Sequence, residues 1–210
     1  MSDLIRRSSP EGRVKSGREG RVAEPAQVLA FWFDTPQAQA TLWRSVWFER
    51  DDAFDAGIRQ RFSATLEAAL AGSLDHWARS AAGALALVIV LDQFPRNLFR
   101  GEARAFAGDA AARRIATSLL AQGWQRELTA VQQMFAYLPF EHAECLADQD
   151  RSVALTARWR DDPQLATCYD YALRHREVIR RFGRFPHRNA VLGRHSTERE
   201  RAWLDAHGGF

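Results

Sequence analysis

This sequence has few cysteines and no long apolar run, and both absences limit what the protein can be. Its two cysteines, Cys145 and Cys168, do not form a Cys-x-x-Cys pair, which argues against a disulfide framework and against a thiolate zinc site. The longest apolar stretch runs from Ala81 to Leu91 and is too short to cross a bilayer. The first twenty residues contain no apolar core of a secretion signal. We therefore expect a cytoplasmic protein without membrane spans.

Lysine is almost absent: Lys15 is the single lysine, whereas the chain has 28 arginines. The formal net charge is only +3. So small an excess does not by itself indicate nucleic-acid binding. The charge is uneven: residues 1–23 carry +3, residues 24–173 carry −5 and residues 174–210 carry +5. Two interpretations remain open. The basic segment forms surface ion pairs with an acidic body, each contributing about 0–1 kcal/mol, or its arginines line a cationic pocket.

The chain divides into a tail and one domain. Residues 1–23 are rich in arginine, serine and glycine and contain few large aliphatic side chains. Such a segment buries too little surface to offset the entropy of ordering it, so we expect a disordered basic tail. Residues 24–210 are enough for a single domain with one core.

From Pro25 onward the apolar residues recur at helical spacing, and no stretch alternates as a strand does. Capping residues, prolines and glycines predict the helix boundaries. We expect helices from Pro25, from Asp51 or Asp52 to Gly72, from Ala81 to Phe94, from about Arg104 to Gln122, from Thr129 to Leu138, from Pro139 through Leu155, from Asp162 to Gly183, and from Thr197. The sequence thus predicts an all-α fold of about eight helices, stacked as antiparallel hairpins.

Two short motifs nearly repeat each other. They are Phe94-Pro95-Arg96-Asn97, followed by Arg100, and Phe185-Pro186-His187-Arg188-Asn189, followed by Arg194. Each comes after an apolar helical stretch, and its proline disfavours further regular helix, so we expect two loops. Arginine offers a fork of donors that suits a carboxylate or a phosphate, and these loops are therefore candidates for an anion site.

A third motif, Pro139-Phe140-Glu141-His142-Ala143-Glu144, is expected to open a helix. On that helix Glu141, Glu144 and Asp148 would share one face. These carboxylates can pair with the arginines of the basic segment. A histidine within reach would instead create the carboxylate–imidazole pair that acid–base catalysis uses. The histidine spacing is not that of a zinc site, and we predict no metal and no cofactor.

Asp92 ends an otherwise apolar helix, where an unpaired carboxylate would be costly. Its plausible partners are Arg96, Arg100, Arg184 and Arg188. The pair would either clamp two loops together or orient an arginine toward a ligand.

Several of these segments together resemble a known family. They are Leu91-Asp92-Gln93-Phe94-Pro95-Arg96-Asn97 with Arg100-Gly101, Leu138-Pro139-Phe140-Glu141-His142 with Glu144 and Gln149, and Arg181-Phe182-Gly183-Arg184-Phe185-Pro186-His187-Arg188-Asn189 with Leu192-Gly193-Arg194 and Ser196-Thr197. Upstream, Val28-Leu29-x-Phe31-Trp32-Phe33 and Trp47-Phe48 fit as well. The chain resembles the bacterial domain of unknown function 924 over about residues 25–204. The resemblance implies a helical fold related to tetratricopeptide-repeat (TPR) domains and implies no established reaction.

We hypothesise that the three motifs meet in a pocket that binds a small anionic molecule, a carboxylate or a phosphate. The ligand-binding candidates are Asp92, Arg96, Asn97, Arg100, Glu144, Arg184, Arg188, Asn189 and Arg194, and the acid–base candidates are Glu141, His142 and His187. The hypothesis requires Arg96 and Arg188 to lie close together. Two alternatives stay open, a TPR-like scaffold that binds acidic peptides and a polar network that serves folding alone. We expect neither a membrane nor a nucleic-acid partner, and the sequence specifies neither a reaction nor an oligomeric state.

Overall fold

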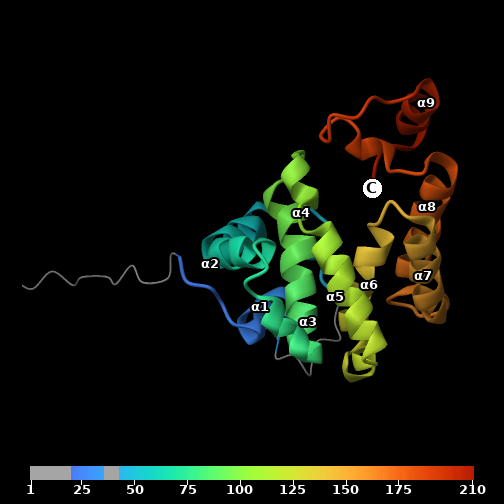
Figure 1. Cartoon of the computed structure of the whole chain (residues 1–210). Helices are drawn as coiled ribbons and strands as arrows, with labels where there is room; N and C mark the ends of the chain where they lie inside the picture. The colour runs from blue at the N-terminus through green and yellow to red at the C-terminus, as the bar shows by residue number, and fades with distance from the viewer. Residues whose placement is uncertain (1–19, 36–42) are drawn as a thin grey trace, which may run out of the picture.

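The computed structural model describes residues 20–35 and 43–210, and within them all regular secondary structure is helical (Figure 1). Residues 1–19 of the expected tail lie outside the described residues. The helices are α1 (Pro25–Phe33), α2 (Asp52–Leu70), α3 (Ala81–Val88), α4 (Phe94–Leu98), α5 (Asp109–Ala121), α6 (Ala130–Glu141), α7 (Leu146–Thr156), α8 (Ala166–Phe182) and α9 (Glu198–His207). Short 3₁₀ turns, among them Ala103–Phe106 and Pro186–Arg188, connect them. The all-α prediction is confirmed.

Side-chain caps begin the helices where the sequence predicted them. The Asp51 carboxylate accepts from the Phe54 N–H at 2.8 Å at the start of α2, and the Ser80 hydroxyl caps α3. Thr129 and Thr197 form capping boxes at the starts of α6 and α9. Each such cap satisfies backbone donors that the first turn leaves open and contributes about 1 kcal/mol.

Helix α3 is the centre of the core. Its buried residues pack against α1, α5 and α6, and Figure 1 shows α2 on one side of it with α5, α6, α7 and α8 following on the other. An aromatic cluster around Trp32, Trp47 and Phe135 closes the core beside α1. Burying each such side chain contributes about 1.5–3 kcal/mol. None of the helices in the described part of the chain has the length and apolarity to span a membrane.

The motif from Phe94 to Asn97 is helical, and the prediction of a loop there is wrong. After α3 the chain makes a π turn, Ile89–Gln93, and continues directly into α4. The Phe94 N–H donates to the Ile89 carbonyl, five residues back. The wider turn starts a new α-helical register, so Pro95 occupies the first turn of α4, where its missing N–H costs little. The π turn leaves Asp92 and Gln93 buried.

Pro139 does not begin a helix, which corrects a second expectation. It lies inside α6, which continues to Glu141, and the next helix starts only at Leu146. Every residue from Val131 to Glu141 is buried, and this packing outweighs the loss of one backbone hydrogen bond at the proline. Glu141, Glu144 and Asp148 therefore do not share a helical face.

Two further helices begin later than expected. Asp162 accepts from the N–H groups of Gln164 and Leu165 at 2.9 and 3.0 Å, which stabilises a turn that precedes α8. Helix α5 begins at Asp109, after the 3₁₀ turn Ala103–Phe106. This late start places the Asp109 carboxylate at the N-terminus of α5 and beside the motif from Phe94 to Asn97.

Candidate functional site

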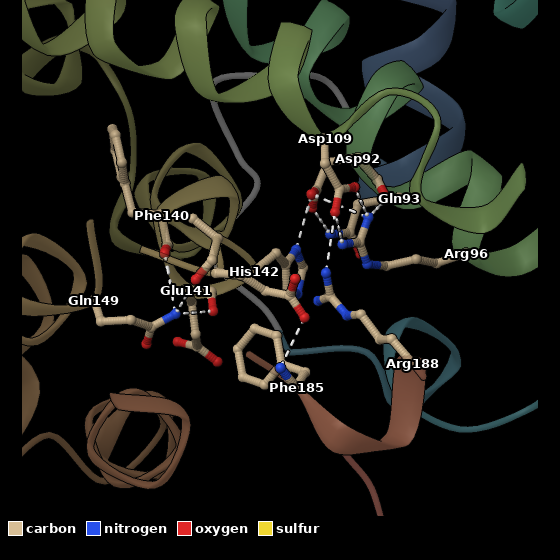
Figure 2. A network of polar contacts seen from close by, with 12 residues as sticks. Asp92, Gln93, Arg96, Asp109, Phe140, Glu141, His142, Gln149, Phe185 and Arg188 are labelled. Atoms are coloured by element: carbon tan, nitrogen blue, oxygen red, sulfur yellow. Dashed lines mark hydrogen bonds and ion pairs between the residues drawn. The ribbon is translucent and has the colours of Figure 1, made fainter. Parts of the chain in front are cut away.

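The ends of several helices converge on one group of polar side chains, which we call the central polar network (Figure 2). It consists of Asp92 and Gln93 from the π turn, Arg96 from α4, Asp109 from the start of α5, His142 from the end of α6 and Arg188 from the turn Pro186–Arg188. Segments from the middle and from the last quarter of the chain thus meet at one place.

Asp92 holds the network together from inside the core. Its side chain is fully buried, and its Oδ1 lies 2.8 Å from His142 Nδ1 and 3.2 Å from Arg96 Nη1. The other oxygen, Oδ2, accepts a hydrogen bond from the Gln93 amide. Burial raises the pKa of Asp92, but the charge of Arg96 and the contacts with His142 outweigh it and hold the pKa at about 2. Asp92 is therefore a carboxylate at neutral pH, with its negative charge matched by its neighbours.

His142 is held as a neutral imidazole. Burial and the charge of Arg96 lower its pKa, in spite of the neighbouring Asp92. Because Asp92 is ionised, the Nδ1–H of His142 donates to it, which leaves Nε2 as the basic nitrogen. Nε2 makes no hydrogen bond within the described residues, and the side chain keeps 15% of its surface exposed. The ring is therefore oriented by a carboxylate and keeps a free site for a proton.

Arg96 and Arg188 meet at the same carboxylate. Arg96 binds Asp109 through two hydrogen bonds, of 2.8 and 3.1 Å, and Arg188 Nη1 lies 3.3 Å from Asp109 Oδ2. The two guanidinium groups are therefore close together, as the hypothesis required, although their sequence positions are far apart. Both share Asp109, so neither faces open solvent as an unpaired cation.

Arg188 retains donors that nothing in the described chain uses. Its guanidinium lies between the rings of Phe106 and Phe185, with its central carbon 4.5 Å from each centroid, and the residue is only 6% exposed. Its Nε is buried without a hydrogen-bond partner among the described residues. Burial lowers its pKa to about 10, so the group stays charged at neutral pH. Nearby, His187 Nδ1 is also buried without such a partner.

Glu141 belongs to a separate pair. Its carboxyl points away from Asp92 in Figure 2, and its Oε1 lies 3.3 Å from Nδ1 of His175 on α8. Burial and the negative charge of Asp92 raise the pKa of Glu141 to about 8, and burial lowers that of His175 to about 3. Both groups are mainly neutral at pH 7, so the contact is not an ion pair, and His175 Nδ1–H donates instead to the Tyr171 carbonyl at 2.9 Å. Glu141 thus lies outside the central polar network.

The basic candidates near the end of the chain stabilise their own loop. Arg184 binds Glu200 through hydrogen bonds of 2.6 and 2.9 Å. Arg194 binds Glu144 in the same bidentate way, at 2.6 and 2.8 Å, and Asn189 donates to Ser196 and accepts from Arg194. These contacts fix the loop that carries Phe185 and Arg188.

Asn97 lies on another face of α4 from Arg96, and Arg100 lies in the turn after α4. Both contact Asp55 of α2, Asn97 through a hydrogen bond of 2.8 Å and Arg100 through an ion pair. These two residues therefore lie apart from the central polar network: one helical step turns Asn97 about 100° from Arg96, and Arg100 follows the end of α4 and reaches Asp55.

Sequence reasoning did not assign three polar residues to the site: Gln93 and Asp109 of the central polar network, and Gln149 beside it. Asp109 was placed in the interior of an expected helix, although it starts α5 and joins both arginines. Gln149 donates to the carbonyls of Glu141 and Ala143 at 2.6 and 2.8 Å, and so satisfies the end of α6 next to His142. The Gly108-Asp109 dipeptide is a helix-start signal that could have identified Asp109. No group of three or more His, Cys, Asp or Glu residues within residues 20–35 and 43–210 is arranged to hold a metal ion.

Comparison with known proteins gives the family of this chain. The model of the family described as "Bacterial protein of unknown function (DUF924)" matches residues 28–208. The chain belongs to this family. It is also similar to a solved structure described as a protein of unknown function, ATU0120, from Agrobacterium tumefaciens, with 37% identity over 87% of this chain and 97% of that one and a TM-score of 0.77. Among curated proteins nothing matches. The expected DUF924 family is confirmed.

Proposed function

We propose that this DUF924 protein binds a small carboxylate- or phosphate-bearing molecule at the central polar network and exchanges a proton with it through His142. The observation that carries the proposal is the 2.8 Å contact between a fully buried Asp92 and His142 Nδ1. A carboxylate in this position fixes the tautomer and orientation of an imidazole, so that its other nitrogen can act as a general base. Because the pKa of His142 is lowered, the base form is present at neutral pH.

Arg188 supplies the contact to the anion in this proposal. Its Nη1 faces Asp109, and the edge formed by Nε and Nη2 makes no hydrogen bond within the described residues. A carboxylate or phosphate at this edge would receive two parallel hydrogen bonds. The rings of Phe106 and Phe185 hold the guanidinium in place, so little side-chain entropy is lost on binding.

The charge balance of the network favours a ligand with a single anionic group at this point. Asp92 and Asp109 neutralise Arg96 and Arg188, and His142 is neutral. A highly charged ligand would gain little from a site without net charge. We therefore propose a monocarboxylate or a phosphate monoester that also carries a hydroxyl group, and this hydroxyl lies next to His142 Nε2 and exchanges its proton with it.

The test is a thermal-shift screen of small carboxylates and phosphates with the wild-type protein and with the variants Arg188→Gln and His142→Gln. A ligand present at about 100 times its Kd stabilises the folded protein by about 2.7 kcal/mol. We expect Arg188→Gln to lose this stabilisation and His142→Gln to keep binding while losing any turnover. Arg114→Gln, a change at an exposed arginine of α5, is the matched control. No stabilisation of the wild type by any member of the panel, or an unchanged response in Arg188→Gln, would refute the proposal.

The two other hypotheses predict different results. A network that serves folding alone predicts that Arg188→Gln lowers the melting temperature equally with and without the panel molecules. A TPR-like scaffold for acidic peptides predicts that an acidic peptide binds and that Arg184→Ala abolishes its binding. Arg184 is already bound to Glu200, so an acidic peptide would have to displace that carboxylate.

A further inference from the structure

A second basic site lies beside α2, apart from the central polar network. A recess of about 750 Å³ opens between α2 and the end of α4, and its wall includes Asn97 and Arg100, which both point away from the central polar network. Helices α2 and α4 pack against each other, and α2 contributes a stripe of side chains at positions 52, 55, 56, 59, 60, 63 and 64, with Arg61 beside it. This spacing of three and four residues places one helical face along the recess.

The recess has a clear excess of positive charge. Five arginines and two aspartates line it, and both aspartates are already paired. Asp52 lies 2.8 Å from Arg50, and Asp55 pairs with Arg100 and with Asn97. The other three arginines of the wall, Arg21, Arg59 and Arg61, have no carboxylate partner within the described residues.

Two of these three arginines are held in place by uncharged groups. Arg59 Nη2 donates to the Leu98 carbonyl at 3.1 Å, and the Arg61 guanidinium lies over the Phe31 ring, 5.3 Å from its centroid. A carbonyl and a ring face orient a guanidinium without neutralising its charge. The wall therefore presents positioned cations whose charge is not matched by protein carboxylates.

We propose that this recess binds a small polyanion that carries about three negative charges on neighbouring oxyanion groups, of which inorganic diphosphate is the simplest example. The volume lies within the range of small-molecule sites, about 300–1,000 Å³. Among the described residues the wall has no aromatic side chain, so the site offers no ring on which a nucleobase would stack. A guanidinium group binds phosphoryl and carboxyl oxygens alike. This site is independent of the one proposed around His142.

The experiment is isothermal titration calorimetry on the full chain at constant ionic strength, with inorganic diphosphate, orthophosphate and citrate as probes. We expect diphosphate to bind at least tenfold more tightly than orthophosphate, because it spans more than one guanidinium. The double variant Arg59→Ala with Arg61→Ala should weaken diphosphate binding at least tenfold. Ser63→Asp, which adds a negative charge to the same wall, should weaken it while leaving all arginines in place. Citrate distinguishes a polycarboxylate ligand from a polyphosphate ligand. If citrate binds as tightly as diphosphate and loses its binding in the same variants, the ligand of this recess is a polycarboxylate.

The matched control is Arg114→Ala with Arg174→Ala, which removes the same charge from the exposed surface of α5 and α8. It should bind diphosphate as the wild type does. An equal loss of affinity in the control would show nonspecific attraction and overturn the proposal. So would unchanged binding in the Arg59/Arg61 variant, or the absence of binding of both diphosphate and citrate by the wild type. Circular dichroism and urea unfolding would confirm that each variant is folded.

Discussion

Gly108 lies directly against the backbone of Leu91. A Cβ atom at position 108 would come within 2.0 Å of the Leu91 carbonyl oxygen, so the chain before α5 touches the π turn without a side chain between them. The next residue, Asp109, is thereby brought to Arg96. The close approach of two backbones sets the geometry of the central polar network.

Gly108→Ala should therefore destabilise the protein and disturb the network. Either Leu91 or the start of α5 has to move, and overpacking of this kind costs about 1–3 kcal/mol. Urea unfolding measures the loss. The control is Gly57→Ala, a helical glycine whose Cβ would meet only the ring of Phe31, at 3.2 Å; its effect should be smaller. Equal stability of the wild type and Gly108→Ala would contradict the packing described here.

The Glu141–His175 pair should make stability depend on pH in a defined direction. Glu141 has a pKa of about 8 in the folded protein, above its ordinary 4.5, so its contribution is lost as the pH rises from 4.5 through 8. His175 has a pKa of about 3, below its ordinary 6.5, so its contribution grows as the pH rises from 3 and is complete above 6.5. Between pH 6.5 and 8 only the change at Glu141 remains from this pair.

The unfolding free energy of the wild type should therefore fall by about 2 kcal/mol between pH 6.5 and 8, since one proton changes stability by about 1.4 kcal/mol per pH unit. In Glu141→Gln this fall should be absent. Urea unfolding at several pH values in this range measures it. Glu127→Gln, at an exposed position, should keep the wild-type slope. A wild-type slope in Glu141→Gln would show that this carboxyl is ionised in the folded protein.

Asp92→Asn should be among the most damaging isosteric changes in the chain. It leaves Arg96 with Asp109 alone and removes the charged acceptor of the His142 N–H. Removing one partner of a buried ion pair costs about 3–5 kcal/mol. The pKa of Asp92 is about 2, below its ordinary 3.8, so its contribution is present above pH 3.8 and is lost as the pH falls toward 2. The difference between variant and wild type should therefore shrink below pH 3.8.

Chemical denaturation at pH 7 and at pH 3 tests this expectation, with Asp205→Asn on the exposed face of α9 as the control. Nitrogen-15 NMR of His142 adds a second measurement. In the variant its pKa should fall further, because the negative charge that favours the imidazolium is gone. A raised pKa for His142 would contradict the arrangement.

Gln149→Ala should loosen the end of α6. The Gln149 amide donates to the carbonyls of Glu141 and Ala143, and buried carbonyls left without donors cost about 1–3 kcal/mol. Hydrogen exchange of the amides between His142 and Leu146 should accelerate along with the loss of stability. Gln164→Ala, at an exposed position before α8, should change neither quantity. Unchanged exchange in Gln149→Ala would mean that water satisfies these carbonyls.

Much of the fold was predictable because helix signals are local. Asp51, Ser80 and Thr197 cap the helices that follow them, and Gly183 ends α8 in the left-handed conformation, as expected from nearby residues alone. The two errors at proline have one cause. A proline in a sequence is interpreted as a helix boundary. At Pro95, however, a π turn changed the hydrogen-bond register of the helix. At Pro139 the burial of the whole helix compensates for the backbone hydrogen bond that the proline cannot make.

The candidate site was predictable in its parts and in one of its pairings. The sequence predicted a paired carboxylate at Asp92, with Arg96 among its candidate partners, and arginines in the two repeated motifs. It did not show that Asp109 joins Arg96 to Arg188, or that Asn97 and Arg100 face a different recess.

By itself, the sequence determined the helical class, most helix starts and the DUF924 family of this chain, since caps, apolar spacing and long composite motifs depend on neighbouring residues. Only the tertiary structure decided which carboxylate each arginine meets and which nitrogen of His142 stays free. Those choices depend on helix ends that are distant in the chain, and burial makes an unmatched charge too costly for any other arrangement.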